Sequence, residues 1–354
     1  LCKGQPALCG TGWQVRRRRR PTNESLLMSS QRPLDDFRAL IERMPKQEVE
    51  AGAAVTHLFE GNRAGESRLA GIASLFARVS GGRPSMSRPS LALFAGTHGI
   101  ARHGISARRM DATLAMVGAC GSGDAPVNHL CAANMIGLKV YDLALHLPTG
   151  DISATAAMDE RNAAATMAFG MEAIAGGADC VLVGSIGSTG DETVAAALFC
   201  ALHGGDPSDW LPDDDLAGKR GTLVADALET HSAVLGDPLS VLAALGGREF
   251  AAMAGAILAA RIEKVPVILD GTTALAAASA LWAIDPATIA HCLLAEAATG
   301  AGTRAAAALR LKPLLADGLA AGEGTAAALA TSTVRDALSL HAGFAAQARS
   351  AHHH

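Results

Sequence analysis

The stretch AAGEGTAAALA (residues 320–330) places a carboxylate, Glu323, between Gly322 and Gly324 at the start of an alanine-rich segment. An acidic residue at a helix start is favoured by the partial positive charge of the helix N-terminus. The two glycines leave space for a ligand, so the same carboxylate could instead act as a general base. From the residues alone both interpretations stand.

Two histidines occur in the stretch GTHGIARHGISA (residues 96–107), directly after an apolar run. An imidazole exchanges a proton near neutral pH, so His98 is a candidate for a group that faces a ligand. The competing interpretation is that His98 braces the loop through a hydrogen bond to the backbone. The residue types do not separate the two.

A third candidate is the glycine-rich stretch GSIGSTGDET (residues 184–193), which contains Ser185 and Gly187. Its backbone N–H groups could surround a phosphate at the start of the following helix. The spacing differs from a Walker A loop and no lysine follows it. Asp191 and Glu192 are equally explained as acidic residues in the first turn of a helix.

Other polar groups and glycines lie next to expected element ends. Lys219 is near a helix start, where it could pair with a phosphate or lie on a solvated helix face. Gly246 and Gly247 precede a helix, and close packing explains them as well as ligand contact does. Asp270 and Gly271 end an apolar run, and in a parallel sheet the carboxyl end of a strand is where ligands bind.

Five short runs, apolar at nearly every position, are expected to form the scaffold: residues 91–96, 138–145, 179–186, 265–271 and 290–297. Continuous apolar runs are typical of parallel strands that are covered on both faces. The stretches between them have the length of crossover helices, which lie on both sides of such a sheet. The sequence therefore predicts an α/β fold, a three-layer, doubly wound parallel sheet.

The two ends of the chain are expected to be helical. We assign residues 28–90 and 321–350 to a small helical subdomain, the second region closing the active site, and residues 91–320 to the α/β domain. Residues 1–27 lack an initiating methionine and any periodicity, so we expect a segment that comes from cloning or from upstream translated sequence, or one that is disordered. Residues 351–354 are interpreted as the remnant of a purification tag.

Composition narrows the functional class of this chain of 354 residues. A formal net charge of -4 argues against a nucleic acid partner. The seven cysteines form no CxxC pair, so we expect reduced thiols and no metal site. The most apolar stretch, residues 251–260, is too short to cross a membrane, and we expect a cytoplasmic protein without a membrane partner.

Three stretches, taken in order, carry a resemblance to a known family. GTHGIARHGISA, ALGGREFAAMAGAILAARIEKVPVILDG and LRLKPLLADGLAAGEGTAAALA resemble segments of the nicotinate-nucleotide:dimethylbenzimidazole phosphoribosyltransferases, and the likeness extends from about residue 50 to residue 345. It implies a parallel α/β sheet with a small helical domain, a homodimer, and small-molecule substrates without metal or cofactor. The implied reaction moves the phosphoribosyl group of nicotinate mononucleotide to 5,6-dimethylbenzimidazole, giving nicotinate and α-ribazole 5'-phosphate for the lower ligand of cobalamin.

The resemblance also assigns roles to individual positions. Glu323 matches the family's general base, and the GTHG loop matches a loop that lines the benzimidazole site. The remaining matches are expected to contact the substrates as well. With the GTHG loop included, the residues expected to contact the substrates are Thr97, His98, Gly99, Ser185, Gly187, Lys219, Gly246, Gly247, Asp270, Gly271, Gly322 and Gly324. Ser185 stands where the family usually has glutamate, so the alternative is a non-catalytic or re-specialised relative that binds a base or nucleotide without this turnover.

Overall fold

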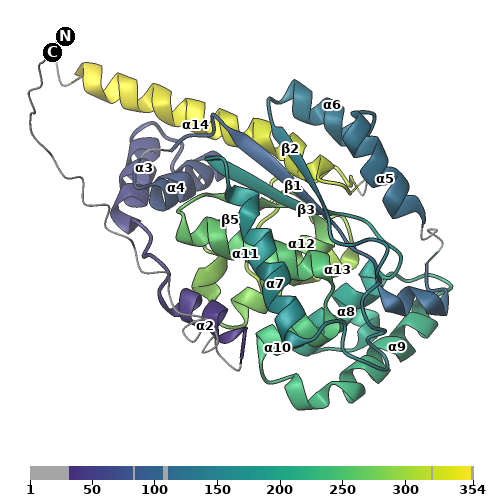
Figure 1. Cartoon of the computed structure of the whole chain (residues 1–354). Coiled ribbons are helices and arrows are strands. Elements are labelled where there is room, and N and C mark those ends of the chain that lie inside the picture. The colour runs from purple at the N-terminus through teal and green to yellow at the C-terminus, as the bar shows by residue number, and fades with distance from the viewer. Residues whose placement is uncertain (1–31, 83, 107–110, 320–321, 352–354) are drawn as a thin grey trace, which may run out of the picture.

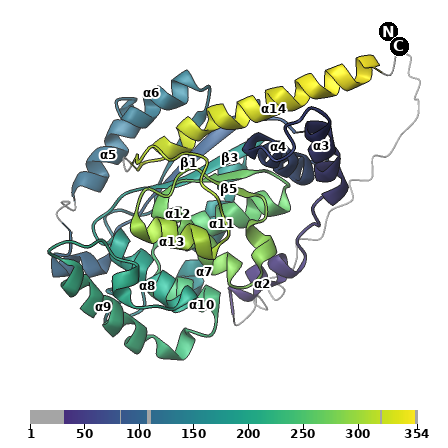
Figure 2. The same ribbon diagram turned by 180° about the vertical axis from the view of Figure 1, so that it is seen from behind.

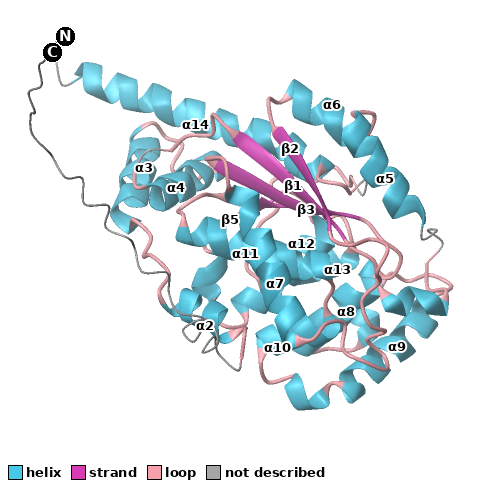
Figure 3. Cartoon of the chain, viewed as in Figure 1, coloured by secondary structure: helices cyan, strands magenta, loops and turns pink. Residues whose placement is uncertain are grey.

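The computed structural model describes residues 32–82, 84–106, 111–319 and 322–351. Five parallel strands form one sheet in the order β2-β1-β3-β4-β5. Figure 3 shows β2, β1 and β3 side by side in magenta. The five strands are β1 (Pro89–Ala95), β2 (Gly137–Asp142), β3 (Cys180–Ile186), β4 (Val267–Leu269) and β5 (Cys292–Leu294). Each lies within or overlaps one of the five apolar runs, which confirms the predicted parallel sheet.

Helices cover both faces of the sheet (Figure 1). Leu91 and Leu93 of β1 pack on one helical layer, and the alternate residues Ala92 and Phe94 pack on the other. The first layer contains α4 (Arg68–Ser80), α5 (Asp111–Ser122), α6 (Pro126–Ala133) and α14 (Thr325–Ala351). The second contains α7 (Glu160–Met171), α8 (Asp191–His203), α10 (Pro238–Leu245), α11 (Arg248–Ile262) and α12 (Gly271–Trp282). This is the predicted three-layer α/β arrangement.

Small residues let two of these helices approach closely. A Cβ atom added to Gly170 of α7 would overlap the carbonyl oxygen of Ala252 in α11. One added to Gly255 of α11 would likewise overlap the carbonyl oxygen of Met167 in α7. The glycine and alanine content of these segments therefore serves helix packing rather than ligand binding.

The helical regions at the two ends of the chain pack together in part. Figure 2 shows that helix α14 runs past α4 and α3 (Val49–Gly61). The rings of Phe59 and Phe344 meet edge to face with centroids 5.1 Å apart. Helix α2 (Asp35–Glu42), in contrast, joins the main core through Phe37 and Ile41. The division into a main domain and a subdomain stays a prediction.

The assignments for residues 1–27 and 352–354 lie outside the described residues. Ala351, grouped above with the tag remnant, is the last residue of α14. Among the helices that the structure describes, none has the length and apolar character needed to cross a bilayer.

Candidate functional site

A cavity of about 230 Å³ opens at the carboxyl ends of β3, β4 and β5. This is the edge of a doubly wound sheet where ligands bind. It brings together about half of the residues singled out in the sequence: Ser185, Gly187, Asp270, Gly271, Gly322 and Glu323. These residues come from the ends of two strands and from the segment that enters α14.

Glu323 is held in a conformation that few residues of its type adopt. Its φ angle is 51°, between Gly322 at 68° and Gly324 at 79°, so three successive residues are left-handed. The left-handed region costs an L-residue about 1 kcal/mol, and such strain persists only where the surroundings impose it. The side chain is nevertheless only 9% exposed and lines the cavity. The local fold thus places Glu323 in the wall of the cavity.

The two flanking glycines have different roles. Gly322 lines the cavity, and a Cβ atom added there would meet nothing within 4 Å. At Gly324 an added Cβ would lie 2.6 Å from Cδ2 of Leu91, because this residue packs against the sheet. Gly324 therefore allows the chain to approach β1, while Gly322 leaves the cavity side open.

Asp270, at the end of β4, anchors the start of α14. Its Oδ2 accepts a hydrogen bond from Gly324 N (2.9 Å), and its Oδ1 accepts one from Ala327 N (2.8 Å). Burial raises the pKa of the Asp270 carboxyl, although these backbone hydrogen bonds oppose that effect. The side chain both lines the cavity and fixes the start of the helix that follows Glu323.

Glu296 was not singled out in the sequence, although it also follows a strand, β5. Its carboxylate is buried and accepts hydrogen bonds from Gly318 N (2.6 Å) and Leu319 N (3.0 Å). It lines the same cavity as Asp270 and Glu323. The rule that directed attention to Asp270, an acidic residue at the carboxyl end of a strand, applies equally to Glu296.

Two helices begin at the cavity wall. Helix α12 contributes Thr272 and Thr273 from its first turn, and α13 (Gly300–Ala308) contributes its N-cap Thr299. The hydroxyls of Thr272 and Thr299 are 2.9 Å apart. Free N–H groups and the helix dipole make such helix starts suitable for a phosphate or another anion. No pattern in the sequence singled out these threonines.

The glycine-rich loop after β3 forms another wall. Asp191 and Glu192 line the cavity where α8 begins. Asp191 accepts hydrogen bonds from Ser188 N (3.1 Å) and Glu192 N (2.8 Å), which close the loop on itself. Burial raises the pKa of the Asp191 carboxyl, and nearby His98 opposes that shift. These acidic residues hold the loop and also face the cavity.

His98 is not among the residues that line the cavity. It is 1% exposed, and its Nε2 lies 2.6 Å from Oε1 of Glu249 in α11. Burial by itself would lower the pKa of His98, but the charge and hydrogen bond of Glu249 outweigh it and raise that pKa above 6.5. A Cβ atom on Gly247 would lie 2.8 Å from Oε2 of Glu249. The role of Gly247 here is to leave space for this pair.

Other candidates near His98 are also occupied by internal contacts. Thr97 is buried and donates its hydroxyl to the carbonyl oxygen of Leu145 (3.0 Å). A Cβ atom on Gly99 would lie 2.7 Å from Asp151 N, and Gly246 packs equally closely on Leu242. The structure thus places these residues in the scaffold around the cavity rather than on its surface.

Lys219 is exposed in the first turn of α9 (Ala217–Thr230), away from the cavity lining. Its neighbour Arg220, in contrast, is buried. Nε of Arg220 donates to the carbonyl oxygen of Ile105 (2.8 Å), and Nη1 pairs with Asp214 at 2.9 Å. Arg220 therefore ties α9 to the chain just before Ser106, a residue of the cavity wall.

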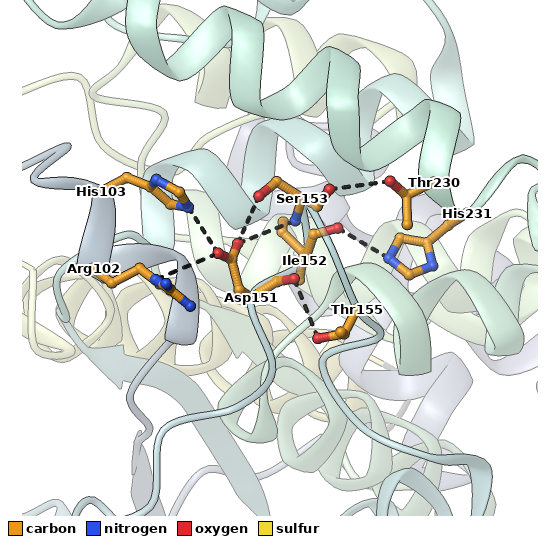
Figure 4. Close-up of polar contacts among 8 residues, drawn as sticks. All are labelled: Arg102, His103, Asp151, Ile152, Ser153, Thr155, Thr230 and His231. Carbon is orange, nitrogen blue, oxygen red and sulfur yellow. Dashed lines mark hydrogen bonds and ion pairs between the residues drawn. The ribbon is translucent and has the colours of Figure 1, made fainter.

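His103, the second histidine of the stretch GTHGIARHGISA, belongs to a polar cluster around Asp151 (Figure 4). Its Nε2 lies 2.7 Å from Oδ2 of Asp151 at the end of the short helix η1 (Gly99–His103). Asp151 Oδ1 accepts from the backbone N–H and the hydroxyl of Ser153. His231 Nε2 approaches the carbonyl oxygen of Ile152 at 3.0 Å. The cluster fastens the segment after β2 to both η1 and α9.

Among the described residues, no group of three or more histidine, cysteine, aspartate or glutamate side chains is arranged to hold a metal ion.

Comparison with known proteins points to one group. A family profile described as "Phosphoribosyltransferase" matches residues 57–351. The nicotinate-nucleotide–dimethylbenzimidazole phosphoribosyltransferase of Rhizobium etli is 45% identical over 322 residues, covering 88% of this chain and 95% of the relative. The protein of the same name from Brucella melitensis is 46% identical over 323 residues, with the same coverage. A crystal structure of the corresponding protein from Thermus thermophilus is 28% identical, has a TM-score of 0.76, and matches 82% of this chain and 95% of that one.

Proposed function

Because the chain belongs to the nicotinate-nucleotide:dimethylbenzimidazole phosphoribosyltransferase family, we propose that it transfers the phosphoribosyl group of nicotinate mononucleotide to 5,6-dimethylbenzimidazole. The products are nicotinate and α-ribazole 5'-phosphate, the nucleotide of the cobalamin lower ligand. The observation that carries this proposal is Glu323, a nearly buried carboxylate directed to the cavity at the carboxyl edge of the sheet.

Glu323 is assigned the role of general base. The unprotonated nitrogen of the benzimidazole attacks C1' of the ribose, and the N–H on its other nitrogen becomes more acidic as the bond forms. A carboxylate within hydrogen-bond reach can accept that proton, and general-base help of this kind is worth about 10²- to 10⁴-fold in rate. Gly322 supports this role because the cavity beside it is free of side-chain obstruction.

The donor nucleotide is placed with its phosphate at the starts of α12 and α13. Thr272, Thr273 and Thr299 offer hydroxyls there, next to the N–H groups of two helix N-termini. As the new bond to C1' forms, the bond from C1' to the nicotinate nitrogen breaks and its electron pair returns to that nitrogen. The leaving nitrogen is cationic in the nucleotide, so departure needs no acid. The acidic residues of the cavity, such as Asp191, suit that positive charge.

A direct test is to incubate the purified protein with nicotinate mononucleotide and 5,6-dimethylbenzimidazole and to follow the products by mass spectrometry. We expect nicotinate and α-ribazole 5'-phosphate in equal amounts. Binding of both compounds without either product would instead support the non-catalytic alternative, for which the unusual GSIGSTGDET loop is the motive.

We also propose a homodimer in the cytoplasm. Leu114 of α5 is 61% exposed and Met135, just after α6, is 77% exposed, so apolar side chains are displayed beside the edge strand β2. The five cysteines in the described ranges are buried and free, as in a reducing compartment. Sedimentation equilibrium of the whole chain tests the dimer, and a monomer at micromolar concentration would contradict it.

A further inference from the structure

We propose that Asp270 and Glu296 are positioning residues that act through Glu323. Asp270 holds the backbone just after the base, at Gly324 and Ala327, and Glu296 holds the backbone ahead of it, at Gly318 and Leu319. This inference rests on the proposed function. It goes further by assigning to two buried carboxylates a task in catalysis other than contact with the substrates.

The two carboxylates follow neighbouring strands at the carboxyl edge of the sheet. Leu269 of β4 pairs with Leu294 of β5, so Asp270 comes directly after this pair on β4 and Glu296 comes one residue later after β5. They are close enough for the charge of Glu296 to raise the pKa of Asp270. Both are buried, 5% and 4% exposed. The burial of two like charges close to each other is unfavourable unless each is well satisfied by hydrogen bonds. That requirement is met by backbone N–H groups before and after Glu323.

Glu296 holds the chain ahead of Glu323, at Gly318 and Leu319. The chain after α13 runs beside β5, where Leu314 N donates to Leu294 O (2.9 Å) and Leu315 N donates to Ala295 O (2.8 Å). It then turns away at Gly318 and Leu319, and both of their N–H groups donate to Glu296. Glu296 thus fixes the point at which the chain leaves the sheet.

Asp270 holds the backbone just after Glu323. It receives the N–H of Gly324, the residue directly after the base, and that of Ala327 in the first turn of α14. Asp270 also lies close to Gly184 of β3. A Cβ atom added to Gly184 would lie 3.1 Å from the Cβ atom of Asp270. The position of Asp270 is therefore set by the sheet, and Asp270 transmits that position to the backbone next to Glu323.

Strain makes this support necessary for the base. Glu323 has a left-handed backbone, which a free chain would abandon for the more stable right-handed or extended regions. Hydrogen bonds to ionised carboxylates are among the stronger ones in proteins. If they are weakened, Glu323 can relax and its carboxylate moves. A displacement of about 1 Å at a reacting group can reduce a rate by about 10²-fold.

The experiment uses Asp270→Asn and Glu296→Gln in the full chain. Each amide keeps one acceptor oxygen but turns a donor toward the second backbone N–H. Asp179→Asn is the matched control, since Asp179 also accepts two backbone N–H groups, from Ser87 (2.6 Å) and Arg88 (2.8 Å), at the opposite end of the sheet. We expect kcat to fall by about 10- to 100-fold in the two test variants with KM changed by less than about 3-fold, and the control to keep its kcat.

Two further readouts separate positioning from mere stability. Combined with Glu323→Gln, Asp270→Asn should reduce kcat little beyond Glu323→Gln alone, because both changes disable the same base. Hydrogen–deuterium exchange should be faster at Gly324 and Ala327 in Asp270→Asn, and at Gly318 and Leu319 in Glu296→Gln.

The possible outcomes are distinct. Unchanged kcat in both folded test variants, or fully additive losses in the double variant, would overturn the proposal. If Asp270→Asn does not fold, Glu296→Gln decides by the same criteria. If the wild-type chain shows no turnover, the proposed function fails. Unchanged exchange at these four amides would show separately that the two carboxylates do not hold the backbone at Gly318, Leu319, Gly324 and Ala327.

Discussion

Nε2 of His98 lies 2.6 Å from Oε1 of Glu249, and both side chains are 1% exposed behind the cavity loops. Gly247 and Gly96 leave the space for Glu249, since an added Cβ at either would collide with its carboxylate. This ion pair joins the loop after β1 to α11. It is a structural device near the site, and its charge makes it sensitive to pH.

Stability should therefore fall as the pH rises above neutrality. The pKa of His98 is raised in the folded protein. The contribution of His98 to the free energy of unfolding is therefore fully present below pH 6.5 and is lost as the pH rises through the folded pKa. Urea unfolding at pH 6 and pH 8.5 measures this. In Glu249→Gln burial dominates and lowers the pKa of His98, so the sign of this contribution should reverse.

The control for that experiment is His57→Gln, because His57 has a largely exposed side chain on α3. This variant should retain the pH dependence of the wild type. An identical pH dependence in wild type and Glu249→Gln would show that the pair does not titrate as described.

A second prediction concerns the glycines beside the base. Gly324→Ala adds a Cβ against Leu91 in a left-handed residue, so we expect a loss of about 2–4 kcal/mol in the free energy of unfolding. Gly322→Ala has open space and should lose only about 1 kcal/mol from its left-handed backbone. Equal losses in chemical denaturation would contradict the difference in packing between these two positions.

A third prediction concerns the cluster of Figure 4. Burial raises the pKa of Asp151, but hydrogen bonds from Ser153 and His103 outweigh it and leave the pKa below 3.8. Asp151→Asn should lower the unfolding free energy by about 1 kcal/mol at pH 7. The wild-type advantage is present above pH 3.8 and disappears as the pH falls through the lowered folded pKa. A difference that persisted unchanged to about pH 2 would argue against a charged Asp151 as its source.

The sheet could be predicted from the sequence because its strands are covered on both faces. Runs such as LALFAG and DCVLVGSI are apolar at nearly every position, and this pattern survives whatever helices pack on them. Strands β4 and β5 are shorter than their runs. Asp270 follows β4 directly and Glu296 comes two residues after β5, and both side chains accept hydrogen bonds from backbone N–H groups that precede α14.

Residues of the site could be predicted from the sequence only where they directly follow a strand or belong to a motif. Glu323, Asp270 and Ser185 were found in this way, and they do line the cavity. Thr272 and Thr299 come from the starts of helices distant in sequence, and their proximity depends on how those helices cross the sheet. For such residues the sequence shows the residue type but not which residues lie close to one another in space.

His98 shows the opposite difficulty. Its place in a glycine-rich loop after β1 suited a ligand contact, but its partner Glu249 is about 150 residues further along the chain. Nothing in the spacing of REFAAM marks that glutamate as the buried counter-ion of a histidine. The pairing arises from the packing of α11 beneath the loop.

The measurement closest to the central claim is the turnover of Glu323→Gln with nicotinate mononucleotide and 5,6-dimethylbenzimidazole. We predict that kcat falls by about 10²- to 10⁴-fold, the range expected for loss of a general base, while the far-UV spectrum and the affinity for the base are retained. Glu160→Gln, which alters a carboxylate in the first turn of α7 away from the cavity, should keep wild-type turnover. A Glu323→Gln enzyme within a few-fold of wild type would contradict the assignment of Glu323 as the base.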